Sequence, residues 1–234
     1  MKKINKKIVF GEPCIDKNFK KKLLQNLDSK WIGTGPLSKK FEQIFSNYKK
    51  TKFSFSVNSC TSAIFLSLKS LNLKKNDEVI TTPMTFCSTI NCIIHAGGKP
   101  ILVDIKKDTL NIDEDKIEQK ITKNTKALLI VHFAGLPCNM KKIIKIVKKY
   151  KLILIEDCAH AIESKYENKH VGNFGYSGCY SFYVNKNITT CDGGMITTKN
   201  KKMARYIEHN RLHGLSKDAW KRFFPSKQKK SIYF

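Results

Sequence analysis

The chain has 234 residues, of which 41% are hydrophobic, and its mean hydropathy is −0.36. That length allows one substantial core. No apolar run approaches the ~18 residues of a membrane span, and no hydrophobic stretch follows the basic N-terminal residues, so we expect no secretory signal. These features exclude a membrane protein, a fibre, a small disulfide scaffold and a fully disordered chain.

The formal net charge is +25, from 44 Lys and Arg residues against 19 Asp and Glu residues. Only three of the basic residues are Arg, whereas proteins that read nucleic acids often concentrate Arg. The lysines are scattered in pairs at the ends of apolar segments, which favours a solvated Lys-rich surface over a nucleic-acid site. A basic module that binds nucleic acid or another acidic surface remains the alternative.

Eight cysteines are spread along the chain, and none forms a C-x-x-C pair. The one tight Cys/His grouping is Cys158-Ala159-His160, which supplies too few ligands for a zinc site. We therefore predict reduced thiols, a cytoplasmic location and no metal.

From residue 53 onward, strand-like segments alternate with segments of helical periodicity. The predicted strands are 53–57, 78–81, 100–103, 127–132, 152–155, 178–183 and 194–198. The predicted helices are 61–71, 85–95, 113–120, 140–150 and 199–212. Such alternation predicts an α/β fold, with a mostly parallel central sheet flanked by helices. Ligands of these sheets usually bind beyond the carboxyl ends of the strands.

Small hydroxyl residues lie between the first predicted strand and helix, in Asn-Ser-Cys-Thr-Ser-Ala at 58–63. A helix start offers free backbone N–H groups, which suit a phosphate. The alternative is ordinary helix capping by Ser59 or Thr61.

Two charged residues follow apolar strands. Asp157, after Glu156, ends a buried strand, where a carboxylate needs a partner such as a cation, a metal or a protonated ring nitrogen; its alternative role is a helix N-cap. Lys186 is the only lysine between Lys169 and Lys199. A partly buried lysine can act as an amine nucleophile towards an aldehyde, although an ordinary lysine in a surface turn has the same pattern.

Phe86 lies near the predicted sheet mouth, where it would either stack on a flat cofactor or belong to the core. A phosphate cradle, a strand-end Asp and an isolated Lys together fit pyridoxal 5′-phosphate (PLP). The chemistry of PLP requires a lysine amine and an acidic partner for the ring nitrogen.

Several ordered motifs extend this pattern across residues 11–222. They are IEDCAHA at 155–161, KHVGNFG at 169–175, SFYVNKNITTCDGGM at 181–195, WIGTGP at 31–36, NSCTSA at 58–63, VITTPMTF at 79–86 and RLHG at 211–214. The sequence thereby resembles the DegT–StrS family of PLP-dependent aminotransferases that act on nucleotide-linked keto-sugars. The resemblance implies the large domain of an aspartate-aminotransferase-like (fold type I) enzyme.

The resemblance also implies roles for individual residues. Lys186 would be the catalytic amine that binds the cofactor aldehyde and moves a proton. The other cofactor-binding residues would be Asp157 at the ring nitrogen, His160 near the ring hydroxyl, Phe86 on the ring face, and Thr61, Ser62 and Ser181 at the phosphate. Gly33, Thr34 and Gly35 would lie near the substrate entrance. The expected reaction passes an amino group from a donor, glutamate by family habit, to a keto-sugar used in amino-sugar and polysaccharide biosynthesis.

The sequence also departs from the family pattern. Cys60 and Cys191 stand where Gly or Ala is common. We expect a PLP-binding domain over 1–222, a disordered basic tail over 223–234, and no C-terminal small domain. A homodimer is implied, weakened by that loss, and a non-catalytic remnant is the alternative to an active enzyme. Dehydratases of the same type replace the cofactor-binding lysine by His, so Lys186 argues against that activity.

Overall fold

The structure of the protein, a computed structural model, describes residues 11–214. The predicted tail over 223–234 lies outside the described residues. Within the described part, no helix combines the length and the apolar character needed to cross a membrane.

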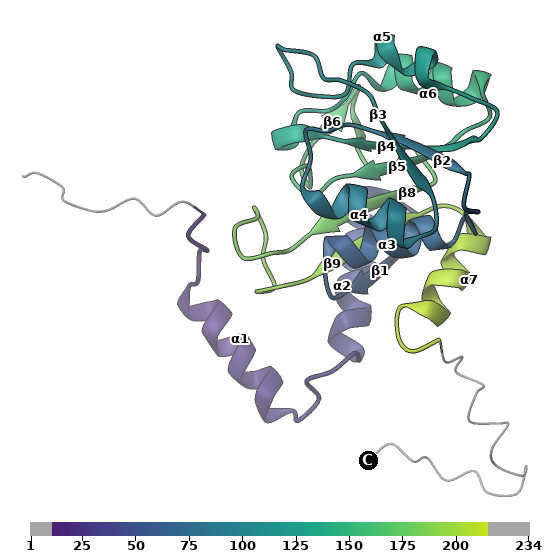
Figure 1. The fold of residues 1–234 in the computed structure, drawn as a ribbon. Helices are drawn as coiled ribbons and strands as arrows, with labels where there is room; N and C mark the ends of the chain where they lie inside the picture. Colours follow the sequence, from purple (N-terminus) through teal and green to yellow (C-terminus); the bar gives the residue numbers. More distant parts are fainter. Residues whose placement is uncertain (1–10, 215–234) are drawn as a thin grey trace, which may run out of the picture.

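A seven-stranded sheet forms the centre of the described chain, in the order β1-β9-β8-β5-β4-β2-β3 (Figure 1). Its strands are β1 (Phe53–Val57), β2 (Glu78–Thr81), β3 (Lys99–Leu102), β4 (Thr125–Val131), β5 (Ile153–Asp157), β8 (Ser177–Ser181) and β9 (Gly194–Thr198). Only β9 runs antiparallel to its neighbours, and the other pairs are parallel. The mostly parallel sheet predicted from the sequence is confirmed.

Helices precede, connect and follow the strands, and those beyond residue 53 end within a few residues of the predicted ones. The helices are α1 (Lys17–Asp28), α2 (Pro36–Lys49), α3 (Cys60–Lys69), α4 (Cys87–His95), α5 (Glu114–Ile117), α6 (Met140–Lys149) and α7 (Lys201–Asn210), with 3-10 turns η1 (Glu118–Lys120) and η2 (Phe133–Gly135). Helices α1 and α2 and the hairpin of β6 (Lys165–Tyr166) and β7 (Lys169–His170) were not predicted.

The side chains of β4 show why this sheet needs helices on both faces. Ala127 and Leu129 pack with α3, α4 and α7, whereas Leu128 and Ile130 pack with α5 and α6 on the opposite face (Figure 1). Successive residues of a strand point to opposite faces, so a continuous apolar run is buried twice.

Helix α2 adds a smaller core near β8 and β9. Phe45 packs edge-on against Tyr180 and Phe182, all of them buried. Helix α1, in contrast, has no buried residue and lies apart from the sheet (Figure 1).

Candidate active site

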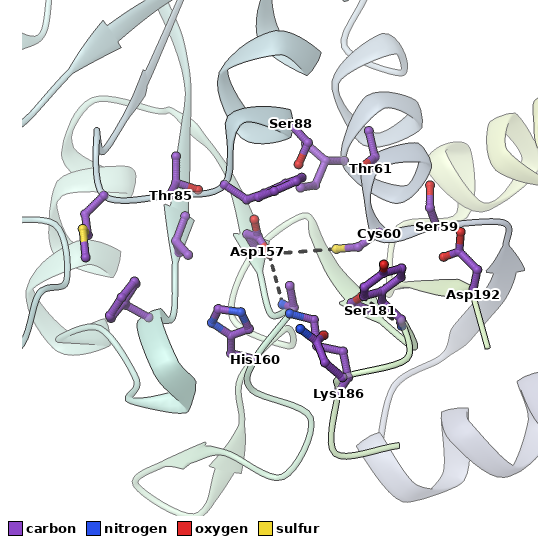
Figure 2. Close-up of a pocket in the computed structure, with 18 residues that line it drawn as sticks. Ser59, Cys60, Thr61, Thr85, Ser88, Asp157, His160, Ser181, Lys186 and Asp192 are labelled. Carbon is purple, nitrogen blue, oxygen red and sulfur yellow. Dashed lines mark hydrogen bonds between the residues drawn. The ribbon is translucent and has the colours of Figure 1, made fainter. Parts of the chain in front are cut away.

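A cavity of about 700 Å³ opens at the carboxyl ends of β4, β5 and β8. Figure 2 shows side chains from several loops converging on it. Its lining consists of Ser59, Cys60, Thr61, Ile64, Met84, Thr85, Phe86, Ser88, Val131, Phe133, Asp157, Ala159, His160, Ser181, Tyr183, Asn185, Lys186 and Asp192. The cavity therefore lies where the topology predicts a ligand site.

The start of α3 forms one wall of the cavity. Ser59 is the N-cap, and its Oγ accepts the N–H of Ser62 at 3.1 Å. The first N–H groups of a helix, here those of Cys60 and Thr61, have no acceptor inside the helix. Gly194 allows the turn to approach β9, because a Cβ there would lie 2.4 Å from the carbonyl carbon of Ser59. Capping and an anion-binding wall thus coexist at this turn.

Asp157 is the last residue of β5, and its side chain is only 5% exposed. Its Oδ1 accepts the Ala159 N–H at 3.0 Å, and its Oδ2 accepts the Thr89 hydroxyl at 3.2 Å. Burial raises the pKa of Asp157. The N-cap alternative for Asp157 is wrong, because no helix follows β5 directly. Asp157 instead supplies a buried carboxylate that borders the cavity.

Lys186 lies in the loop after β8, half-buried, and borders the cavity. Its backbone N–H donates to the Tyr183 carbonyl at 3.0 Å, which fixes the turn. His160 lies nearby (Figure 2). The pKa of His160 is lowered by burial and, secondarily, by the positive charge of Lys186. Both effects favour the neutral form of the His160 imidazole.

Two further predicted residues line the cavity. Phe86 lines the cavity and is 75% exposed, so the alternative of a core position is wrong. It occupies the N-cap position of α4, where the chain turns at the cavity wall. Ser181 ends β8, and its Oγ accepts the Tyr183 N–H at 3.3 Å. Both residues thus belong to the same site as Lys186.

Four predicted residues lie elsewhere. Ser62 follows the capping turn but does not line the cavity; its Oγ accepts the Ser59 hydroxyl at 3.2 Å. Gly33 and Gly35 line a separate groove between α1 and α2, and the Thr34 carbonyl accepts the indole N–H of Trp31 at 3.2 Å. Among its lining residues, that groove has lysines as its only charged groups.

Several lining residues were not predicted. Phe133 follows β4, so the rule of strand ends could have indicated it. Thr85 and Asn185 neighbour predicted residues in the chain, and Asp192 precedes a glycine pair. Their presence in the cavity depends on loop paths that residue type alone does not specify.

A second titratable cluster lies within the core rather than at the cavity. His132, Glu156 and Cys158 are buried, with ligand-type atoms within 4.8 Å of one another. His132 Nδ1 accepts the Cys138 N–H at 3.1 Å, so the ring proton is on Nε2 and is donated to Glu156 at 3.2 Å. The Glu156 carboxylate also accepts three backbone N–H bonds, each 2.7 Å long, from Gly172, Phe174 and Gly175. These bonds make the cluster a structural network.

Comparison with known proteins relates this geometry to a family. The model of the DegT/DnrJ/EryC1/StrS aminotransferase family matches residues 13–229. The spore coat polysaccharide biosynthesis protein SpsC of Bacillus subtilis is 40% identical over 223 residues, which are 95% of this chain and 57% of SpsC.

Solved structures have the same fold. PseC of Helicobacter pylori, an aminotransferase of pseudoaminic acid biosynthesis, is 34% identical with a TM-score of 0.87, over 91% of this chain and 58% of PseC. Spr1654 of Streptococcus pneumoniae in its PLP-form is 32% identical with a TM-score of 0.86, over 90% of this chain and 59% of that one. The chain thus spans a little over half the length of these relatives. It belongs to the DegT/DnrJ/EryC1/StrS aminotransferase family.

Proposed function

We propose that the protein is a PLP-dependent aminotransferase that moves an amino group from an amino acid, glutamate by family habit, to a keto group of a nucleotide-linked sugar. The observation that carries this proposal is one cavity bordered by a half-buried amine at Lys186, a buried carboxylate at Asp157 and a capped helix start at Ser59. Those groups match the three ends of PLP: its aldehyde, its ring nitrogen and its phosphate.

The residues present fit that cofactor. Asp157 has lone pairs beyond its two hydrogen bonds to Ala159 and Thr89, so it can accept a ring N–H. The helix start and the hydroxyls of Thr61 and Ser181 suit a phosphate. Phe86 offers an exposed aromatic face at the same cavity.

When bound, PLP serves as an electron sink for the carbon that carries the amine. Lys186 Nζ would hold the aldehyde covalently, be displaced from it by the amine of the donor, and then act as the base that takes a proton from the α-carbon of the donor. Asp157 would keep the ring nitrogen protonated, and His160 would lie near the ring hydroxyl. In the overall reaction, the amino acid donor would lose its amino group and become a keto acid, and the keto group of the sugar would become an amine.

Partners and location complete the proposal. We propose a homodimer, supported by family membership. We also propose a cytoplasmic enzyme of amino-sugar biosynthesis, supported by eight free cysteines and by the similarity to SpsC and PseC. We further propose that residues 1–222 form the PLP-binding domain.

The test is a half-reaction with the purified protein. PLP-loaded protein is mixed with L-glutamate without a sugar, and 2-oxoglutarate is measured. We expect one equivalent of 2-oxoglutarate from wild type and no 2-oxoglutarate from Lys186→Ala. Lys199→Ala, a control at an exposed lysine, should give the same yield as wild type. A nucleotide-linked keto-sugar added next should gain an amine, detected by mass. No 2-oxoglutarate from wild type, or an equal yield from Lys186→Ala, would contradict the proposal.

A further inference from the structure

A buried hydroxyl, that of Thr89, contacts the cavity carboxylate of Asp157. Thr89 lies in the first turn of α4 and is fully buried. Its Oγ1 donates to Asp157 Oδ2 at 3.2 Å. A second hydroxyl follows, because Thr85 Oγ1 lies 2.7 Å from Thr89 Oγ1. Thr85 itself borders the cavity.

The direction of this chain follows from the number of protons. A hydroxyl has one proton to donate, and an ionised carboxylate only accepts. If Asp157 is charged, Thr89 must donate to it, so Thr85 must donate to Thr89. Both hydroxyl dipoles then point their positive ends towards Asp157, which stabilises its charge.

The two oxygens of Asp157 have unequal partners. Oδ1 accepts the Ala159 N–H and lies 3.9 Å from the Cys60 Sγ, a weak donor. Within the described residues, the hydrogen bonds of Oδ2 come from Thr89 alone. Loss of the Thr89 hydroxyl would leave a nearly buried oxygen without a protein partner, which is costly for a charged group.

We propose that Thr89, supported by Thr85, is a positioning residue that keeps Asp157 ionised and oriented for the ring nitrogen of the cofactor. This inference rests on the proposed function for its purpose, but the hydrogen-bond chain belongs to the protein alone. Thr89 lies behind the carboxylate and does not line the cavity, so it acts through Asp157.

Other titratable groups also act on Asp157. Burial has the largest effect and raises the pKa of Asp157, whereas His160 and His132 would lower that pKa when protonated. The thiols of Cys60, Cys92, Cys158 and Cys179 also lie within electrostatic reach of the carboxylate. Thr89→Val keeps all these groups and the approximate side-chain shape, so it isolates the hydroxyl.

The test compares wild type with Thr89→Val, Thr89→Ser and Thr197→Val. Thr197 is a matched control, because it is a buried threonine whose Oγ1 donates to the Gly172 carbonyl at 3.0 Å, away from Asp157. The carboxyl carbon of Asp157 is titrated by NMR in the protein without cofactor. We expect the titration midpoint of Asp157 to be higher in Thr89→Val than in wild type. In Thr89→Ser and Thr197→Val, this midpoint should equal that of wild type.

The second measurement is PLP affinity. We expect the Kd for PLP to rise about tenfold in Thr89→Val, the effect of losing one hydrogen bond to a charged group, with recovery in Thr89→Ser. An Asp157 midpoint in Thr89→Val equal to wild type would overturn the inference, whether or not PLP binds. If wild type fails to bind PLP while its Asp157 midpoint still depends on Thr89, the proposed function fails and the positioning of Asp157 stands. If Thr89→Val does not fold, Thr85→Val takes its place, with the same direction of shift expected and the same equality overturning the inference.

Discussion

Glu156 and Asp157 are neighbours on β5, yet the regions around them differ in every respect that matters for chemistry. Glu156 is fully buried and accepts four hydrogen bonds, one from His132 and three from the backbone at 172–175. Asp157 points to the opposite face, borders the cavity and accepts fewer, weaker bonds.

The difference teaches how one strand end can serve both folding and binding. Alternation along a strand places the two carboxylates on opposite faces of the sheet. A carboxylate with all its acceptor sites filled by the protein holds a loop in place. A carboxylate with unfilled acceptor sites beside a cavity is available to a cationic ligand. Because burial disfavours an unpaired charge, the positive charge of that ligand stabilises the ionised carboxylate.

The largest expected effect is on folding. Glu156→Ala removes the acceptor for four donors, including the buried His132 ring, and should lower the free energy of unfolding by ~3–5 kcal/mol. Urea unfolding followed by circular dichroism measures this change. A loss under ~1 kcal/mol would show that the network is not structural.

The matched change at the neighbouring residue should act on binding instead. Asp157→Asn should raise the Kd for PLP about 10- to 100-fold, because a charged hydrogen bond to the ring nitrogen is replaced by a neutral one. Fluorescence titration with PLP measures it. An unchanged Kd would separate Asp157 from the cofactor.

The same variant makes a prediction about stability and pH. Burial raises the pKa of Asp157 above that of the unfolded chain. Its contribution to stability is therefore present at low pH and is lost as the pH rises through the folded-state value. Without cofactor, Asp157→Asn should be more stable than wild type at neutral pH, and this gain should vanish in acid. The melting temperatures of the variant and of wild type are measured across pH. A variant that is less stable than wild type at every pH would contradict this prediction.

The electrostatic effect of Lys186 on the pKa of His160 should be smaller than the effects predicted above. Since the charge of Lys186 contributes to lowering the pKa of His160, Lys186→Met should raise that pKa, as measured by NMR titration of the imidazole. Lys199→Met serves as the control and should leave it unchanged. If the pKa of His160 were the same in wild type and in Lys186→Met, the Lys186 amine would lie too far from the imidazole to affect its charge.

The smallest effect is expected at Cys60. Its thiol lies 3.9 Å from Asp157 Oδ1 and is a weak donor. Cys60→Ala should change the Kd for PLP by less than about threefold. A tenfold rise in the Kd would show that this thiol contributes as much as Thr89.

Much of this account could be predicted from the sequence, for identifiable reasons. The apolar strands carry a strong signal, so the mostly parallel sheet was predicted correctly. Asp157 and Lys186, singled out by a strand end and by isolation among the lysines, both border the cavity. The roles of the predicted site residues stay predictions. Helices α1 and α2 were missed although apolar residues recur in both at helical spacing, such as Phe19, Leu23 and Leu27 in α1 and Phe41 and Phe45 in α2. Phe45 packs into a core, whereas α1 buries nothing.

Other features depend on the path of the chain. The contact between Thr89 and Asp157 joins segments that are 68 residues apart. The exposed position of Phe86 depends on the turn that leads into α4. The groove that holds Gly33 and Gly35 depends on the angle between α1 and α2, which residue type does not determine.

The most direct test is covalent trapping at one lysine among many. The protein is incubated with one equivalent of PLP, reduced with borohydride and digested, and the labelled peptide is identified by mass. The cavity geometry predicts the label on Lys186 and its disappearance in Lys186→Ala. Label confined to exposed lysines such as Lys199, or an unlabelled Lys186 peptide in wild type, would contradict the central claim.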